Sequence, residues 1–99
     1  MNKTSFPILA DRIHSCLLDN GLRVYVLPRH EIKAVAVQTW VATGSIHEGE
    51  YLGCGLSHFL EHMLFQGTRE YPGNAVSEQI AAFGGSLNAA TSSEFTYFY

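Results

Sequence analysis

Two histidines and a glutamate within five consecutive residues are the part of this sequence best suited to chemistry. His58, Glu61 and His62 read H-x-x-E-H inside the stretch GLSHFLEHMLFQGT, at positions 55–68. On a helix each residue advances about 100°, so the two histidines lie on one face, roughly 40° apart. Neutral imidazole nitrogens stacked one turn apart are ordinary zinc ligands. We therefore interpret His58 and His62 as candidate ligands of one metal ion.

Glu61 falls on the same broad face, where it can lie beside the metal without binding it. From there its carboxylate could take a proton from a water at the metal, as a general base does. Two protein ligands leave coordination positions open, which catalysis requires because water must occupy one of them. The pattern predicts a metal-dependent hydrolytic centre, for which Zn²⁺ suits the ligand type, although two imidazoles alone tolerate several divalent ions.

The alternative is that three polar residues merely share the solvated face of a helix. From composition alone, an H-x-x-E-H arises by chance in about two of a hundred such chains. Apolar residues surround the motif on nearly every side, at Phe59, Leu60, Met63, Leu64 and Phe65. A helix that is apolar all round is expected to be buried. Buried polar groups are costly without a partner, and a bound cation would be that partner.

Strands are expected before this helix. Asn20-Gly21 lies between two apolar runs and predicts a hairpin with a type I′ turn. Residues 22–27 alternate in the manner of a half-buried strand, which Pro28 ends. The run AVAVQTWVATG, from Ala34 to Gly44, suits a strand that is covered on both faces.

Two helices and a second hairpin complete the expected fold. The metal-binding helix should begin near Leu56 or Ser57, after a glycine-rich polar loop. A second helix is predicted from about Asn74, a good N-cap, to Phe83, with Gly84-Gly85 ending it. The stretch SLNAATSSEFTYFY then reads as a strand, a turn at Ser92-Ser93 and a strand. We expect an α+β fold, in which a β-sheet carries both helices on one face.

The composition fits one small folded domain of a water-soluble protein. The chain has 99 residues, of which 46% are hydrophobic and 15% charged, with a net charge of −3. It has no basic stripe, so no nucleic-acid partner is expected, and no apolar stretch long enough to span a membrane. The N-terminus is a poor secretory signal, which favours the cytoplasm. Cys16 and Cys54 are expected to be reduced, partly buried thiols.

Three ordered blocks make the chain resemble a known family. H-x-x-E-H is the inverzincin order of the zinc-binding motif. The blocks LDNGLRVYVLPRH, GLSHFLEHMLFQGT and FGGSLNAATSSEFTYFY closely match the pitrilysin or insulinase family (M16 type) of zinc metallopeptidases, nearest to its processing-peptidase branch. The resemblance covers about residues 16–99 and leaves residues 1–15 as an N-terminal lead-in. The chain also ends inside an apolar strand pattern, so we expect the domain to continue beyond residue 99.

The resemblance implies a role for each residue of the motif. His58 and His62 would bind zinc, and Glu61 would be the general base. Residues 87–91 would form an edge strand along which a peptide substrate lies, contacting Asn88, Ala89 and Ala90. An ordinary interior strand beside a glycine turn is the alternative for this segment. The family's third zinc ligand, a glutamate several dozen residues after the histidines, would lie beyond Tyr99.

The expected function is therefore a zinc-dependent endopeptidase that hydrolyses extended polypeptides. The family resemblance implies a peptide or protein substrate and a homologous second half or subunit that closes a chamber. Two rivals stand beside it: a non-catalytic subunit similar to processing peptidases, and an inactive truncated fragment without the third ligand. Phe95 and Ala90 depart from residues common in the family and could tune the substrate pocket. His14, His30 and His47 match no ligand position, and we expect them in solvated loops.

Overall fold

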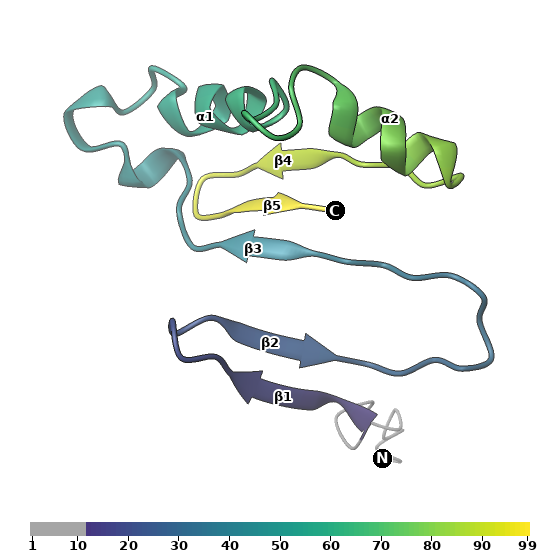
Figure 1. Cartoon of the computed structure of the whole chain (residues 1–99). Helices are drawn as coiled ribbons and strands as arrows, with labels where there is room; N and C mark the ends of the chain where they lie inside the picture. Colours follow the sequence, from purple (N-terminus) through teal and green to yellow (C-terminus); the bar gives the residue numbers. More distant parts are fainter. Residues whose placement is uncertain (1–11) are drawn as a thin grey trace, which may run out of the picture. The chain divides into compact units, whose positions relative to one another are not determined.

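The computed structural model describes residues 12–99, so most of the predicted lead-in lies outside the described residues. The chain divides into two compact units, residues 1–35 and 36–99. Within the described part of the first unit, strands β1 (His14–Leu17) and β2 (Arg23–Val26) form an antiparallel hairpin (Figure 1). β1 thus begins two residues inside the range expected for the lead-in.

The hairpin is confirmed, but its turn is not of type I′. The Gly21 N–H donates to the Leu18 carbonyl at 2.8 Å, and the Leu18 N–H donates to the Leu22 carbonyl at 2.9 Å. Gly21 has a φ of 83°, whereas no non-glycine residue of the described chain has a positive φ. A type I′ turn needs positive φ at both central residues, so Asn20 rules it out. The three-residue loop uses glycine alone for the left-handed conformation. Strand β2 is also more exposed than expected, since Val24 is its one half-buried residue.

The second unit contains a three-stranded antiparallel sheet. Its strands are β3 (Thr39–Val41), β4 (Ala89–Thr91) and β5 (Thr96–Phe98), in the order β3-β5-β4 (Figure 1). The predicted turn between β4 and β5 is confirmed, because the Ser92 N–H donates to the Phe95 carbonyl at 2.8 Å. β4 therefore lies at one edge of this sheet and β5 in its centre.

The prediction of a long strand from Ala34 to Gly44, covered on both faces, is wrong. Only Thr39–Val41 is a strand, and all three of its residues are exposed. Val35 is 90% exposed and Val37 is 72% exposed. β5 offers partners to three residues only, and no described strand pairs with positions 34–38. Strongly apolar, β-branched sequence does not form a strand without a partner to complete its hydrogen bonds.

Both predicted helices are present, on the same side of the sheet (Figure 1). α1 (Leu56–Leu64) begins at the predicted residue and lies against β4. α2 (Ala75–Ala82) follows Asn74, whose side chain makes no capping bond. Its C-terminal end is as expected: the Gly85 N–H donates to the Ile80 carbonyl and the Gly84 N–H, at φ 75°, to the Ala81 carbonyl. This pair of bonds is a Schellman motif. The α+β class is confirmed.

Apolar surface is left open over the whole described chain. No hydrophobic residue among positions 12–99 is buried, and in α1 the buried residue is Glu61. Phe59 and Leu60 are 63% and 61% exposed, so the expectation of a buried helix is wrong for these residues. Among the described elements, α1 contacts β4 and the short 3-10 helix η2 (Ser45–His47), and these contacts leave most of its apolar side chains exposed. Both cysteines are likewise exposed rather than partly buried.

Candidate metal centre

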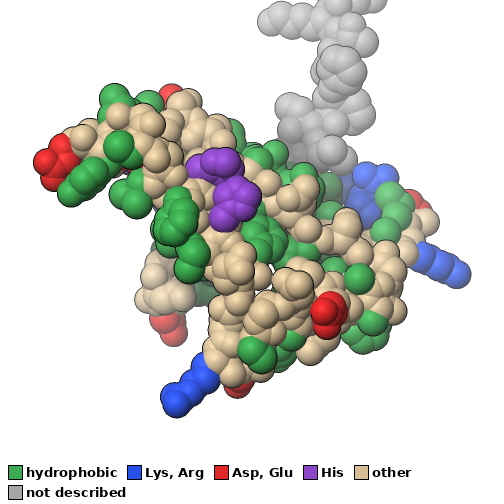
Figure 2. Space-filling view, turned by 90° about the horizontal axis from the view of Figure 1, so that it is seen from above, with side chains coloured by type: hydrophobic (Ala, Val, Ile, Leu, Met, Phe, Trp, Pro, Cys, Tyr) green, Lys and Arg blue, Asp and Glu red, His purple; other side chains and the backbone are tan. Residues whose placement is uncertain are grey.

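The two histidines of α1 direct their side chains to one point. His58 and His62 are four residues apart, their Nε2 atoms are 3.0 Å apart and their ring centroids 4.6 Å. Both side chains are exposed. Figure 2 shows histidine side chains (purple) next to one another at the molecular surface, with apolar side chains (green) around them. One turn of helix is sufficient to build this pair.

Glu61 completes a cluster suited to a divalent metal. One ligand atom from each of His58, Glu61 and His62 lies within 4.8 Å of the others. Metal–nitrogen bonds of about 2.0 to 2.1 Å allow one zinc ion to bridge two nitrogens at the observed spacing. The donor set therefore fits zinc, with the carboxylate beside the nitrogens. Cys54 is not part of this cluster.

The remaining histidines are exposed and lie outside the cluster. His14 is in strand β1 rather than a loop. His47 belongs to a short 3-10 helix, η2 (Ser45–His47), and its Nδ1 accepts the Gly44 N–H at 3.1 Å. Only His30 lies in a loop, as expected for all three.

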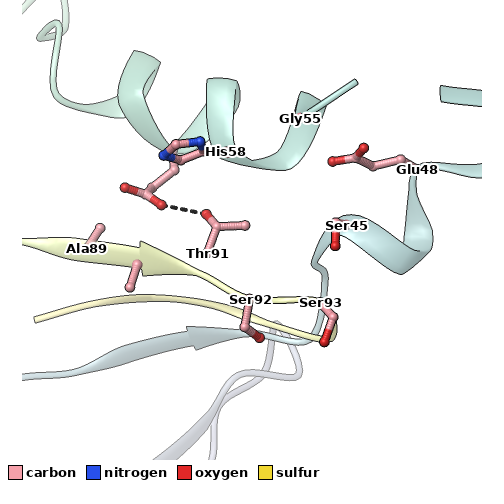
Figure 3. Close-up of a pocket in the computed structure, with 10 residues that line it drawn as sticks. Ser45, Glu48, Gly55, His58, Ala89, Thr91, Ser92 and Ser93 are labelled. Atoms are coloured by element: carbon pink, nitrogen blue, oxygen red, sulfur yellow. Dashed lines mark hydrogen bonds between the residues drawn. The ribbon is translucent and has the colours of Figure 1, made fainter. Parts of the chain in front are cut away.

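A hydroxyl group on β4 holds the Glu61 carboxylate. Thr91 Oγ1 donates a hydrogen bond to Glu61 Oε2, marked by the dashed line in Figure 3. Glu61 is only 7% exposed, whereas both histidines are open to solvent. Behind it, Thr96 Oγ1 donates to the Thr43 carbonyl at 2.9 Å and lies 3.5 Å from Thr91 Oγ1. The general-base candidate is thus fixed between helix and sheet.

Glu48 caps the first turn of α1, a role that its sequence position did not predict. The residue before the helix, Gly55, has no side chain to cap it. Instead Glu48 Oε1 accepts the Ser57 N–H at 2.8 Å. That backbone hydrogen bond lowers the pKa of Glu48, and the N–H groups of Leu56 and Gly55 act in the same direction, against the effect of burial. A glutamate nine residues before its partner has no capping-box spacing, so no local pattern could have found it.

Close contact between two loops forms the floor of the site. The Ser45 N–H donates to the Ser92 carbonyl at 3.2 Å, and the Ile46 N–H donates to the Ser93 carbonyl at 3.0 Å. Gly44 permits this approach, since a Cβ there would lie 2.3 Å from the Ser92 carbonyl oxygen. The chain thus joins the turn between β4 and β5 to the segment that leads into α1.

These elements surround a pocket of about 510 Å³ beside the cluster. Figure 3 shows His58 on the helix facing β4, with Glu48 near the start of the helix and Ser92 and Ser93 in the turn. Backbone and small or polar side chains make most of its wall. The lining residues are Ser45, Glu48, Gly55, His58, Glu61, Ala89, Ala90, Thr91, Ser92 and Ser93. Of the predicted peptide-binding residues, Ala89 and Ala90 line this pocket.

β4 presents a free edge next to this pocket, since no described strand pairs with its outer side. Asn88 and Tyr99 exchange two backbone hydrogen bonds, at 2.7 and 2.8 Å. Antiparallel pairs alternate in type, so the backbone of Ala90 faces β5, while the backbones of Ala89 and Thr91 face outward. The outward Ala89 N–H donates to the side-chain oxygen of Asn88 at 2.9 Å. Asn88 thus has its amide nitrogen left for another partner.

Comparison with known proteins identifies the family of this chain. The family model described as Insulinase (Peptidase family M16) matches residues 23–99. The chain belongs to peptidase family M16. A relative in this family, the uncharacterized zinc protease YmxG of Bacillus subtilis, is 40% identical over 81% of the chain and 19% of that protein. The probable mitochondrial-processing peptidase subunit beta of Arabidopsis thaliana is 40% identical over 94% of the chain and 19% of its own length.

Further M16 relatives show how broad the family is. Cytochrome b-c1 complex subunit 1 of Bos taurus is 38% identical over 83% of the chain and 17% of that protein. The first half of the periplasmic protease PqqL from Escherichia coli superposes with a TM-score of 0.70 and 37% identity, over 89% of the chain and 20% of that structure. The chain thus spans about a fifth of the length of the relatives it matches.

In its described part, no helix is long and apolar enough to cross a membrane. The names of these relatives include mitochondrial and periplasmic proteins, so a cytoplasmic location stays a prediction.

Proposed function

We propose that this chain supplies the catalytic motif of a zinc-dependent endopeptidase. The observation that carries the proposal is the cluster itself, with His58 and His62 Nε2 atoms 3.0 Å apart and a Glu61 oxygen within 4.8 Å. Membership of family M16 supports it, as do relatives named zinc proteases in Bacillus subtilis and Mycobacterium leprae.

The residues of the cluster have separate tasks in this proposal. His58 and His62 hold the ion, which when bound polarises the scissile carbonyl and acidifies water. Glu61 takes a proton from the attacking water and passes it to the leaving amine. Its Oε2 is engaged by Thr91, so Oε1 is the atom that accepts the proton. Glu70, Glu78 and Glu94 do not join the cluster, and we expect a further zinc ligand from outside these 99 residues.

An extended peptide is the substrate that fits the free edge of β4. The outward N–H and C=O groups of Ala89 and Thr91 can pair with any peptide backbone, which gives binding without strict sequence preference. The Ala89 side chain is small, so a peptide can approach closely. In the free protein the side-chain oxygen of Asn88 accepts the Ala89 N–H. This hydrogen bond must break before a peptide can pair with the Ala89 N–H. The amide nitrogen of Asn88 can then donate to a peptide carbonyl.

The test is Glu61→Gln in the complete, zinc-loaded protein that contains this chain, with His58→Ala as the contrasting variant. The amide keeps the size of the side chain but cannot take a proton. Zinc content should therefore persist while peptide turnover falls by at least roughly a hundredfold. His58→Ala should instead lose the metal. Near-normal turnover in Glu61→Gln would contradict the proposed function.

A non-catalytic subunit is the second candidate, and the names of relatives favour it. Cytochrome b-c1 complex subunit 1 matches about as large a share of the chain, 83%, as the zinc protease YmxG does, 81%. A purely structural role gives the H-x-x-E-H residues no task. Zinc-free purified protein that assembles with a partner and hydrolyses no peptide, with or without added zinc, would decide for this candidate.

A further inference from the structure

We propose that Thr91 is a positioning residue that aligns the general base with the strand on which the peptide docks. This inference rests on the proposed endopeptidase function and adds a residue to it. The one buried residue of α1 is Glu61, and its hydrogen-bond partner is thirty residues away in sequence, on β4. A side chain of the sheet thus fixes a side chain of the helix at the centre of the candidate site.

The hydroxyl of Thr91 can donate one hydrogen bond, and Glu61 Oε2 accepts it. The neighbouring Thr96 hydroxyl donates its hydrogen bond to the Thr43 carbonyl at 2.9 Å, so it does not compete for the carboxylate. A carboxylate turns easily about its last side-chain bond, because that torsion is broad. The bond to Oε2 removes this freedom and leaves Oε1 to take the proton from water. Hydrogen bonds to charged groups are among the stronger ones in proteins.

Thr91 also belongs to the surface that would receive the peptide. Thr91 and Thr96 form a non-hydrogen-bonded pair, as Ala89 and Phe98 do. The backbone N–H and C=O groups of Thr91 therefore point to the free edge of β4. Its side chain meanwhile faces Glu61 (Figure 3). Thr91 therefore belongs to the docking strand and also bonds the base. A peptide paired with β4 is held at a fixed distance from the group that activates water.

This arrangement predicts an effect on kcat rather than on KM. Thr91→Val keeps the shape and the backbone of β4 but removes the hydroxyl. In the complete, zinc-loaded protein that contains this chain, kcat should fall by roughly tenfold or more, as for the loss of one charge-assisted hydrogen bond, with KM and zinc content near the parent values. Thr91→Ser restores the hydroxyl and should recover most of the turnover. Thr39→Val, the same change on exposed strand β3, should leave kcat unchanged.

A second measurement does not depend on activity. High-resolution crystal structures of metal-free parent and Thr91→Val should differ at Glu61, with one carboxylate orientation in the parent and more than one in the variant. An unchanged, singly oriented carboxylate in Thr91→Val would overturn the inference, as would equal losses of turnover in the valine and serine variants. If Glu61→Gln is inactive while Thr91→Val turns over normally, only the role of Thr91 fails. If Glu61→Gln itself stays active, the proposed function fails.

Discussion

At the scale of single residues, the candidate site combines two exposed histidines, proposed as metal ligands, with a buried glutamate, proposed as the base. His58 and His62 are open to solvent, which allows an ion to enter. Glu61, which lies between them in the sequence, is 7% exposed and accepts a hydrogen bond from Thr91. The strand beside the cluster carries only small side chains at Ala89 and Ala90, and both residues line the neighbouring pocket.

Ala89→Pro tests whether the outward backbone of β4 receives the peptide. Ala89 gives its N–H to Asn88 rather than to β5, so proline costs the sheet no bond there while it removes the donor from the free edge. We expect KM for long peptides to rise and zinc content to stay intact. The kinetic measurement needs a paired stability control: Ala90→Pro removes a bond to β5 and should lower the unfolding temperature more. A folded, zinc-loaded Ala89→Pro variant that cleaves long peptides as well as the parent would exclude this edge as the docking site.

At the scale of secondary-structure elements, α1 is positioned by contacts at both ends of the motif. The Glu48 carboxylate accepts a hydrogen bond from the Ser57 N–H in the first turn, directly before His58. An anion is favourable there, because the N-terminal end of a helix carries partial positive charge. At the other side of the motif, the bond from Thr91 holds Glu61 to the sheet. Helix and sheet are thus fixed to each other through the chemical groups of the site.

The first of these contacts predicts a pH dependence. The backbone N–H of Ser57 lowers the pKa of Glu48 in the folded protein below the usual value of a glutamate. A group with a lowered folded pKa stabilises the fold above its unfolded pKa, and that contribution is lost as the pH falls through the folded value. The unfolding temperature of the parent should therefore drop as the pH goes from about 6 to 3.

Glu48→Gln removes the titrating group but keeps an oxygen for the Ser57 N–H. The variant should unfold at a lower temperature than the parent near neutral pH, and the difference should shrink in acid. Glu50→Gln, an exposed change in the adjoining short 3-10 helix (Gly49–Tyr51), serves as the matched control. Parallel curves for Glu48→Gln and the parent over the whole pH range would contradict the role given to this carboxylate.

At the scale of the whole molecule, the chain carries a site but little enclosed core. No hydrophobic residue between positions 12 and 99 is buried, and Phe83 is 93% exposed. β3 and β4 are both edges of the three-stranded sheet, and unprotected edges promote association between chains. The chain also spans about a fifth of the proteins it resembles. We therefore predict that additional protein is needed to cover the exposed apolar surface. The metal centre should likewise need a further ligand from additional protein.

These 99 residues produced alone should bind zinc weakly and cleave no peptide. Two histidines leave the centre one protein ligand short of a usual catalytic zinc site, and the uncovered apolar side chains should bind a hydrophobic dye or drive aggregation. Zinc titration by calorimetry, with the His58→Ala version as the blank, measures the first point. Tight, stoichiometric zinc together with peptidase activity in this segment would show that no further ligand is needed.

The sequence by itself determined those features that depend on neighbours within a few residues. The H-x-x-E-H spacing brings two Nε2 atoms to 3.0 Å because one helical turn separates them. The start of α1, the glycine end of α2 and the Ser92 turn follow from equally local rules. Even there a local rule can mislead: Asn20-Gly21 predicted a type I′ turn, but the hairpin adopts a three-residue loop.

Only the tertiary structure decided which distant residues serve the site. Thr91 meets Glu61 across thirty residues, and Glu48 reaches Ser57 across nine, at spacings that no helix or turn produces. Burial was also decided at this level: residues 34–38 read as a covered strand, yet no described strand lies beside them. A hydrophobic sequence shows which side chains can be buried, but burial also requires another part of the protein to pack against them. The motif therefore came from the sequence, and the orientation of its base came from the strand that packs against it.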